Sequence, residues 1–262
     1  MKISVSNIAW KEEQDLEMYS FMKQNKISGL EIAPTRLIVQ SPYQRNEEAK
    51  KIRKNLQDDY LLDIVSMQSI WRGKSEQLFG SAEEQLILKE YTKEAILFAE
   101  AIGSKNLVFG CPKNRVLPEG KKEEEAISFF KELGDYAYKH HTCIGLEANP
   151  KIYGTNFMNT TEQALEMVKK VNSMGCKLNY DFGTNLCNRE KLSDLRENVE
   201  FINHVHISEP NLEIIKKRKE HLELFCILQE GNYQRYVSLE MKSTTNLEEV
   251  KCSLLYVKEI FG

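Results

Sequence analysis

The sequence predicts a single-domain (β/α)₈ barrel, and three observations lead to that prediction. Eight short β-like runs are spread along the 262 residues. Longer, charged, amphipathic stretches separate them, an alternation typical of parallel strands joined by crossover helices. No Pro/Gly/Ser-rich linker interrupts the series, and barrels of about 250 residues commonly form one domain. We therefore expect residues 1–262 to fold as one barrel domain.

Eight is also the number of parallel strands that closes such a barrel. The predicted strands are Lys2–Ser6, Gly29–Pro34, Leu62–Gln68, Asn106–Pro112, Ile144–Pro150, Lys177–Gly183, His204–Pro210 and Tyr236–Lys242. An open doubly wound sheet is the alternative architecture. It is disfavoured because residues 6–10 do not form the glycine-rich phosphate loop expected after its first strand.

Helical periodicity is clearest between these runs at Ala82–Ile102 and Glu123–Tyr138. A further helix is predicted between the fifth and sixth strands. There Thr160 and Gln163 have the spacing of a capping box, and Gly175 is expected to end the helix. Each of these stretches is long enough to cross back over the sheet.

The charge balance argues against nucleic acid as a partner. Lys and Arg number 36 against 39 Asp and Glu, a formal charge of −3, so no strong basic field is available for phosphodiester backbones. The basic run at 216–219 is expected to be a solvated helix face. His140, His141 and His221 are expected at helix surfaces.

The cysteines and the N-terminus indicate a reduced, cytoplasmic protein. Six cysteines are scattered without C-x-x-C spacing, and we expect reduced, mostly buried thiols. The chain begins directly with a predicted strand, and no window approaches 18 apolar residues. We expect no membrane partner, and association into a homo-oligomer is left open.

The last four predicted strands separate cleanly into an apolar and a polar set, as expected if alternate side chains point into the barrel. The inward set is Gly145, Glu147, Asn149, Asn179, Asp181, His204, His206, Ser208, Ser238, Glu240 and Lys242. A barrel interior is normally filled by branched apolar residues, so these polar groups indicate a site.

Four of the inward residues predict a divalent metal site: Glu147, Asp181, His206 and Glu240. Buried carboxylates cost at least several kcal/mol each and repel one another unless a cation neutralises them. Three carboxylates and one imidazole suit Mn²⁺ or Mg²⁺ and tolerate Co²⁺ or Zn²⁺. The alternative is a solvated mouth in which the glutamates pair with Lys242 or Arg115.

The motifs around these residues resemble the xylose-isomerase-like barrels, which include sugar-phosphate isomerases and epimerases and ketohexose 3-epimerases. The matching segments are residues 145–150 (GLEANP), 179–183 (NYDFG), 204–210 (HVHISEP) and 238–242 (SLEMK). The resemblance covers essentially the whole chain. It implies metal ligation by the four residues named above. It also implies that Glu147 and Glu240 remove and return a proton through an enediolate on a carbohydrate substrate.

Three departures from the ketohexose epimerases argue against a free ketohexose as substrate. Thr184, Leu212 and Tyr153 stand where that group has a histidine, an arginine and a glutamate that hold the sugar. Thr184 also replaces a zinc ligand of the related apurinic-site endonucleases, which with the acidic charge balance disfavours that activity. A metal-dependent dehydratase or lyase and a non-catalytic sugar-binding barrel remain the alternative functions.

Further candidates for substrate contacts lie on the loops after the strands, where barrels build their active face. Lys113 and Arg115 follow the fourth strand and could bind a phosphate or carboxylate, or form only an exposed basic loop. The remaining candidates are Trp10, Gln68, Asn149, Tyr153, Glu209 and Lys242. Glu31 and His204 are inward residues that could cap the interior or, for His204, support a metal ligand.

Overall fold

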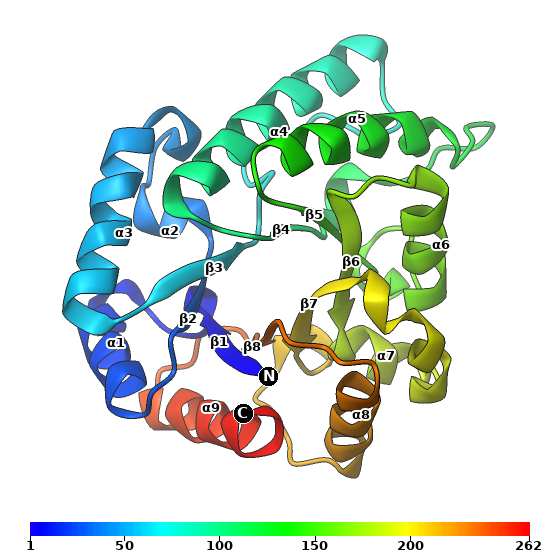
Figure 1. Ribbon diagram of the computed structural model, residues 1–262. Helices are drawn as coiled ribbons and strands as arrows, with labels where there is room; N and C mark the ends of the chain where they lie inside the picture. Colours follow the sequence, from blue (N-terminus) through cyan, green and yellow to red (C-terminus); the bar gives the residue numbers. More distant parts are fainter.

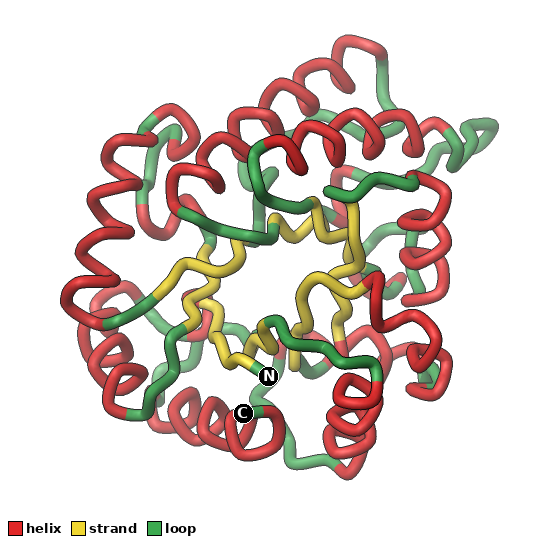
Figure 2. Tube along the Cα trace, viewed as in Figure 1, coloured by secondary structure: helices red, strands yellow, loops and turns green.

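The computed structural model describes residues 1–262, and its eight parallel strands pair in chain order into a closed barrel (Figures 1 and 2). The strands are β1 (Lys2–Ser6), β2 (Gly29–Ile32), β3 (Asp63–Met67), β4 (Leu107–Phe109), β5 (Ile144–Glu147), β6 (Cys176–Asp181), β7 (Ile202–Ile207) and β8 (Tyr236–Leu239). β1 pairs with β8, which closes the ring. The predicted fold class is therefore confirmed.

Helices surround the barrel on its outer face (Figure 2). They are α1 (Asp15–Gln24), α2 (Pro34–Leu37), α3 (Asn46–Tyr60), α4 (Ala82–Ile102), α5 (Glu125–Lys139), α6 (Thr161–Val171), α7 (Phe182–Asn188), α8 (Lys219–Glu230) and α9 (Leu247–Phe261). Short 3₁₀ helices are η1 (Asn7–Ala9), η2 (Glu12–Gln14), η3 (Pro42–Gln44), η4 (Pro112–Asn114), η5 (Lys151–Tyr153), η6 (Leu192–Phe201) and η7 (Pro210–Leu212).

Helix α6 begins as predicted but does not end at the predicted residue. Thr160 accepts from the backbone N–H of Gln163, whose side chain returns a bond to Thr160, so the capping box is present. The helix ends at Asn172, which takes the left-handed conformation (φ 46°). Gly175 has a packing role instead, because a Cβ there would lie 2.1 Å from the Gly134 carbonyl oxygen of α5.

The outward strand residues form the core between barrel and helices. Leu178, Tyr180, Val205 and Ile207 are each at most 1 % exposed and belong to one continuous apolar cluster. The alternation that places these side chains outside necessarily turns their polar neighbours inward. The polar interior is therefore a consequence of the same strand register.

Two predictions about helix surfaces are wrong. The basic run at 216–219 is not a helix face, because α8 begins at Lys219 and Arg218 forms an ion pair with Glu209 at 2.6 Å. His221 is completely buried, with its ring against Phe182 and Tyr256. Aromatic side chains of α7 and α9 cover the ring, and the pattern of α8 alone does not reveal them.

All six cysteines are free, as predicted, but they are not mostly buried. Cys143 and Cys176 are buried, Cys111 and Cys187 are half-buried, and the remaining two are exposed on α8 and α9. None of the helices combines the length and the apolar character that crossing a membrane requires.

Candidate active site

Three of the four predicted metal ligands meet inside the barrel near the C-terminal ends of its strands. Glu147 ends β5, His206 lies on β7, and Glu240 directly follows β8. His206 Nδ1 lies 2.9 Å from Glu147 Oε1 and 3.2 Å from Glu240 Oε2. One ligand atom from each of the three lies within 4.8 Å of the others. The arrangement offers an imidazole nitrogen and two carboxylates to one ion.

Asp181 is adjacent but does not join this group. It pairs in register with His206 across β6 and β7. Its Oδ2 accepts from the N–H and hydroxyl of Thr184, both at 2.8 Å, and its Oδ1 accepts from the Ser208 hydroxyl. The carboxylate therefore caps α7. A carboxylate has about four lone-pair positions, so one on Oδ1 is left for a cation.

Thr184 explains part of this difference. The residue at this position belongs to the first turn of α7. Its hydroxyl oxygen also lies 2.9 Å from the Ala148 carbonyl oxygen, so its single proton is shared between that carbonyl and Asp181. The N–H and hydroxyl of Thr184 together thus hold Asp181 at the start of α7.

The electrostatics of the group favour a shared cation. Burial raises the pKa of Glu240 to about 7, although His206 opposes the shift. Burial and the nearby Glu147 charge also raise the pKa of Asp181. Burial alone would lower the pKa of His206, but the carboxylates of Glu240 and Glu31 raise it well above its ordinary value. The buried carboxylates around His206 Nδ1 therefore favour a positive charge between them, which a bound cation would supply.

Glu31 contacts the other side of His206. Its Oε2 lies 2.9 Å from His206 Nε2 and 3.1 Å from His204 Nε2, and the carboxylate is fully buried. Gln68 donates to the second oxygen at 3.1 Å. Burial disfavours the charged carboxylate, yet the two imidazoles hold the pKa of Glu31 well below its ordinary value. Sequence reasoning noted its inward position on β2 but assigned it no part in the site.

This contact orients His206 as a ligand. An Nε2–H that donates to Glu31 leaves the lone pair on Nδ1, which faces Glu147 and Glu240. Metal-binding histidines commonly donate their second ring nitrogen to a carboxylate in this way. The donor set and its orientation therefore fit a divalent cation held by hard oxygen ligands and one imidazole.

Arg115, a predicted substrate contact, is fully buried, so the alternative of an exposed basic loop does not hold for this residue. Its guanidinium donates to the Glu147 carbonyl at 2.9 Å and to Asn149 Oδ1 at 3.0 Å. Asn149 Nδ2 in turn lies 3.3 Å from Glu147 Oε2. Arg115 and Asn149 therefore hold the end of β5 and, through it, the Glu147 carboxylate.

Three further candidates for substrate contact have their polar groups occupied within the protein. Trp10 is 1 % exposed and donates to Asp15 at 2.7 Å, so its ring belongs to the core and not to a pocket wall. Glu209 binds Arg218 through both oxygens, at 2.8 and 2.6 Å. Gln68 supports Glu31.

The other three candidates are accessible. Lys113 and Lys242 are exposed, and Tyr153 is half-buried. The Tyr153 hydroxyl accepts from the Asn211 N–H at 2.8 Å, which links the loops after β5 and β7. All three follow C-terminal strand ends, the end of a barrel at which substrates bind.

Comparisons with known proteins agree with the fold. A family model described as xylose isomerase-like TIM barrel matches residues 21–260. No curated protein matches the chain. Similar solved structures include a D-psicose 3-epimerase in the presence of D-fructose, with 14 % identity, TM-score 0.82 and full coverage of both chains. A 3-keto-D-glucoside 4-epimerase from E. coli has 19 % identity and TM-score 0.77 over 99 % of each chain. An AP endonuclease, family 2, from Brucella melitensis has 16 % identity and TM-score 0.73 over 99 % of each chain.

Proposed function

Because the chain belongs to the xylose isomerase-like TIM barrel family, we propose that it is a metal-dependent sugar isomerase or epimerase. The observation that carries the proposal is the convergence of Glu147, His206 and Glu240 within 4.8 Å. Sugar epimerases among the similar structures support the same reaction class. Glu147, His206 and Glu240 would hold Mn²⁺ or Mg²⁺, with Asp181 as a fourth ligand through its remaining lone pair.

The two glutamates are the proposed proton-transfer groups. When bound, a divalent ion would polarise a sugar carbonyl and stabilise the charge that develops on its oxygen. Glu147 at the end of β5 and Glu240 after β8 both approach His206 Nδ1, at 2.9 and 3.2 Å. In the proposed reaction one of them removes the proton next to the carbonyl and the other returns one to the opposite face.

The substrate we propose is a phosphorylated or otherwise anionic sugar. Lys113 is an exposed cation on the loop after β4, and Tyr153 and Lys242 offer polar groups from the loops after β5 and β8. A lysine ammonium is a point charge on a flexible stem, so it can reach and bind a phosphate or carboxylate group of a substrate. Arg115 and Asn149 would act by positioning Glu147.

Exchange of solvent deuterium tests the reaction. The enzyme is incubated with Mn²⁺ and a panel of phosphorylated and free sugars in deuterated water. We expect label at the carbon next to the carbonyl. Because a positioned acid or base contributes about 10²–10⁴-fold, Glu147→Gln and Glu240→Gln should each lower exchange by at least about 100-fold at saturating Mn²⁺. Glu162→Gln, an exposed residue of α6, is the matched control.

The same experiment separates the alternatives. Loss of water in the product mass would indicate a dehydratase or lyase. No exchange with any sugar, together with intact metal binding, would contradict the proposed catalysis and favour a sugar-binding barrel.

A further inference from the structure

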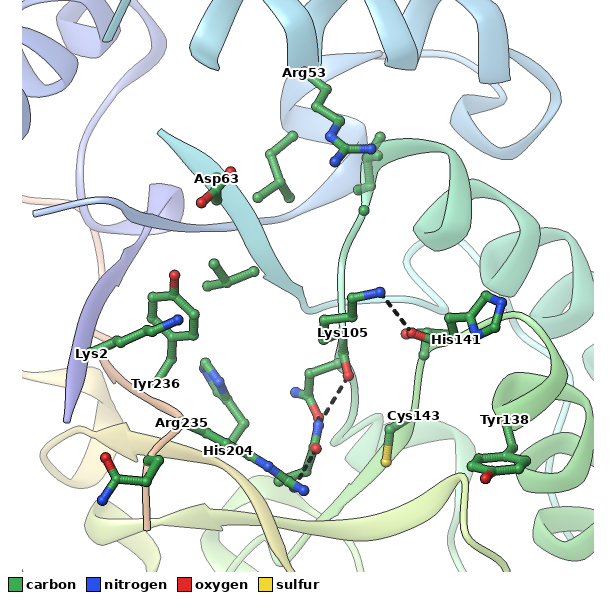
Figure 3. Close-up of a pocket in the computed structure, with 18 of the residues that line it drawn as sticks. Lys2, Arg53, Asp63, Lys105, Tyr138, His141, Cys143, His204, Arg235 and Tyr236 are labelled. Atoms are coloured by element: carbon green, nitrogen blue, oxygen red, sulfur yellow. Dashed lines mark hydrogen bonds between the residues drawn. The ribbon is translucent and has the colours of Figure 1, made fainter. Parts of the chain in front are cut away.

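A cavity of about 870 Å³ lies at the end of the barrel opposite the candidate active site (Figure 3). Its wall includes residues at which strands begin: Lys2 in β1, Asp63 in β3 and Tyr236 in β8. The candidate active site lies at the C-terminal strand ends, and none of Glu147, His206 and Glu240 lines this cavity, although His204 does and also lies 3.1 Å from Glu31. The N-terminal face of a barrel ordinarily serves stability, and a cavity of this size there requires another explanation.

Positive charge dominates the wall of this cavity, which we call the N-terminal mouth. Five cations line it against one carboxylate, Asp63. The cations are Lys2, Arg53, Lys105, Lys139 and Arg235. None of them forms an ion pair, although many other lysines and arginines of the chain do. The chain as a whole has a formal charge of −3, so the positive excess is local.

Several of these cations are held in place by neutral groups. Lys105 Nζ donates to a backbone carbonyl at 3.1 Å, and Arg235 donates to Asn203 Oδ1 at 2.7 Å. The Arg53 guanidinium lies against Gly103, where a Cβ would be 2.7 Å from its central carbon. Gly103 has φ +79° and leaves this space open. The side chains are thus positioned while their charge stays uncompensated.

The wall also offers hydrogen-bonding and aromatic groups. Thr142 is 6 % exposed, and its hydroxyl has no hydrogen-bond partner. A buried hydroxyl without a partner is unfavourable, and an acceptor on a ligand would satisfy it. Tyr138 and Tyr236 contribute rings, and Figure 3 draws them within the same lining as Arg53 and Lys105.

We propose that the N-terminal mouth binds a small phosphorylated metabolite. The volume falls within the range of about 300–1,000 Å³ typical of small-molecule sites. Arginine presents a planar fork that matches phosphate oxygens, and lysine adds mobile point charges. A nucleic acid fits poorly, because the chain as a whole has a formal charge of −3 and five cations at one opening do not form an extended basic track.

Calorimetric titration of the full chain tests this proposal with three probes: inorganic pyrophosphate, adenosine diphosphate and uncharged adenosine. We expect the two phosphates to bind at low ionic strength and adenosine not to bind. The double variant Lys105→Met/Lys139→Met removes two exposed cations and should weaken binding by at least about 10-fold. Lys170→Met, on the exposed face of α6, is the control and should bind as the unmodified protein does.

Two results would overturn the proposal. One is the absence of pyrophosphate and nucleotide binding up to about 5 mM, where a site of useful affinity would be occupied. The other is undiminished binding by a folded double variant, with a loss of binding in Lys113→Met instead, which would assign the anion to the candidate active site. Because the assay needs no turnover, its outcome is independent of the proposed epimerase or isomerase activity.

Discussion

His206 is the side chain on which the candidate site depends, because carboxylates face both of its ring nitrogens. Glu147 and Glu240 approach Nδ1, and Glu31 approaches Nε2 at 2.9 Å. A ring that donates to Glu31 can present only its other nitrogen to a cation. The buried Glu31 is therefore part of the ligand geometry, although it lies outside the predicted ligand set.

Replacing Glu31 by Gln should weaken metal binding without removing a ligand. The amide keeps the size of the carboxylate but loses its charge, so it orients and polarises His206 less well. Loss of such an outer contact typically costs about 10–100-fold in metal affinity. Competition between the protein and a fluorescent chelator for Mn²⁺ measures the change.

Glu162→Gln provides the control. It replaces a carboxylate by an amide, as Glu31→Gln does, but at an exposed position on α6 outside the barrel. It should leave the affinity for Mn²⁺ unchanged. Equal affinities for the Glu31 variant and the unmodified protein would show that Glu31 does not act on the ligand.

The sequence reveals the inward residues of the site but not their hydrogen-bond partners. Alternation along β5, β7 and the end of β8 was sufficient to find Glu147, His206 and Glu240. It could not show that Asp181 caps α7, because that depends on the Thr184 and Ser208 hydroxyls. Side-chain rotamers and loop paths, not strand parity, decide such contacts.

Elements were predicted more reliably than their ends. α4 has the predicted bounds, because a capping box at Ser81 and Glu84 begins it and Gly103 ends it. Several strands were predicted two to three residues too long at their C-terminal ends, as for β2 and β5. Apolar alternation continues there after the ladder of hydrogen bonds stops, and these extra residues form the loops of the site.

His221 joins three helices and should make their packing sensitive to pH. From α8 its ring contacts Phe182 of α7 and Tyr256 of α9, and Nδ1 lies 2.9 Å from the Tyr256 hydroxyl. Its Nε2 is buried without a partner, so protonation would bury an uncompensated charge. Burial accordingly lowers the pKa of His221 to about 4.

The sign of the effect follows from proton binding. Between about pH 6.5 and 4 the unfolded chain binds a proton at this histidine and the folded chain does not, so the free energy of unfolding falls as the pH falls. The loss should reach roughly 2–3 kcal/mol at about pH 4. Urea unfolding of the unmodified protein and of His221→Phe across this range measures it. The difference between the two should change with pH, and a constant difference would rule out His221 as the source.

At the scale of the whole molecule, the two ends of the barrel carry opposite charge. The C-terminal end gathers Glu147, Asp181 and Glu240, and the N-terminal mouth gathers lysines and arginines. The amino-acid composition does not reveal this separation of charge, because the formal charge of −3 is a sum over the whole chain. Lys2, Arg53 and Lys105 are distant in sequence, and only barrel closure brings them to one opening (Figure 3).

Mutual repulsion among the carboxylates at the C-terminal end should make the stability of the entire barrel depend on a cation. An ion that binds only the folded state stabilises it by RT ln(1 + [L]/Kd), or about 2.7 kcal/mol at 100 times the Kd. For a chain of this size that corresponds to a rise in Tm of roughly 5–10 °C. Differential scanning calorimetry with increasing Mn²⁺, after removal of metal with a chelator, measures the rise. In Glu147→Gln/Glu240→Gln two ligands are gone together, so the response of the Tm to Mn²⁺ should be lost. A double variant that still gains stability from Mn²⁺ would show that the ion binds elsewhere, and the proposed site would have to be abandoned.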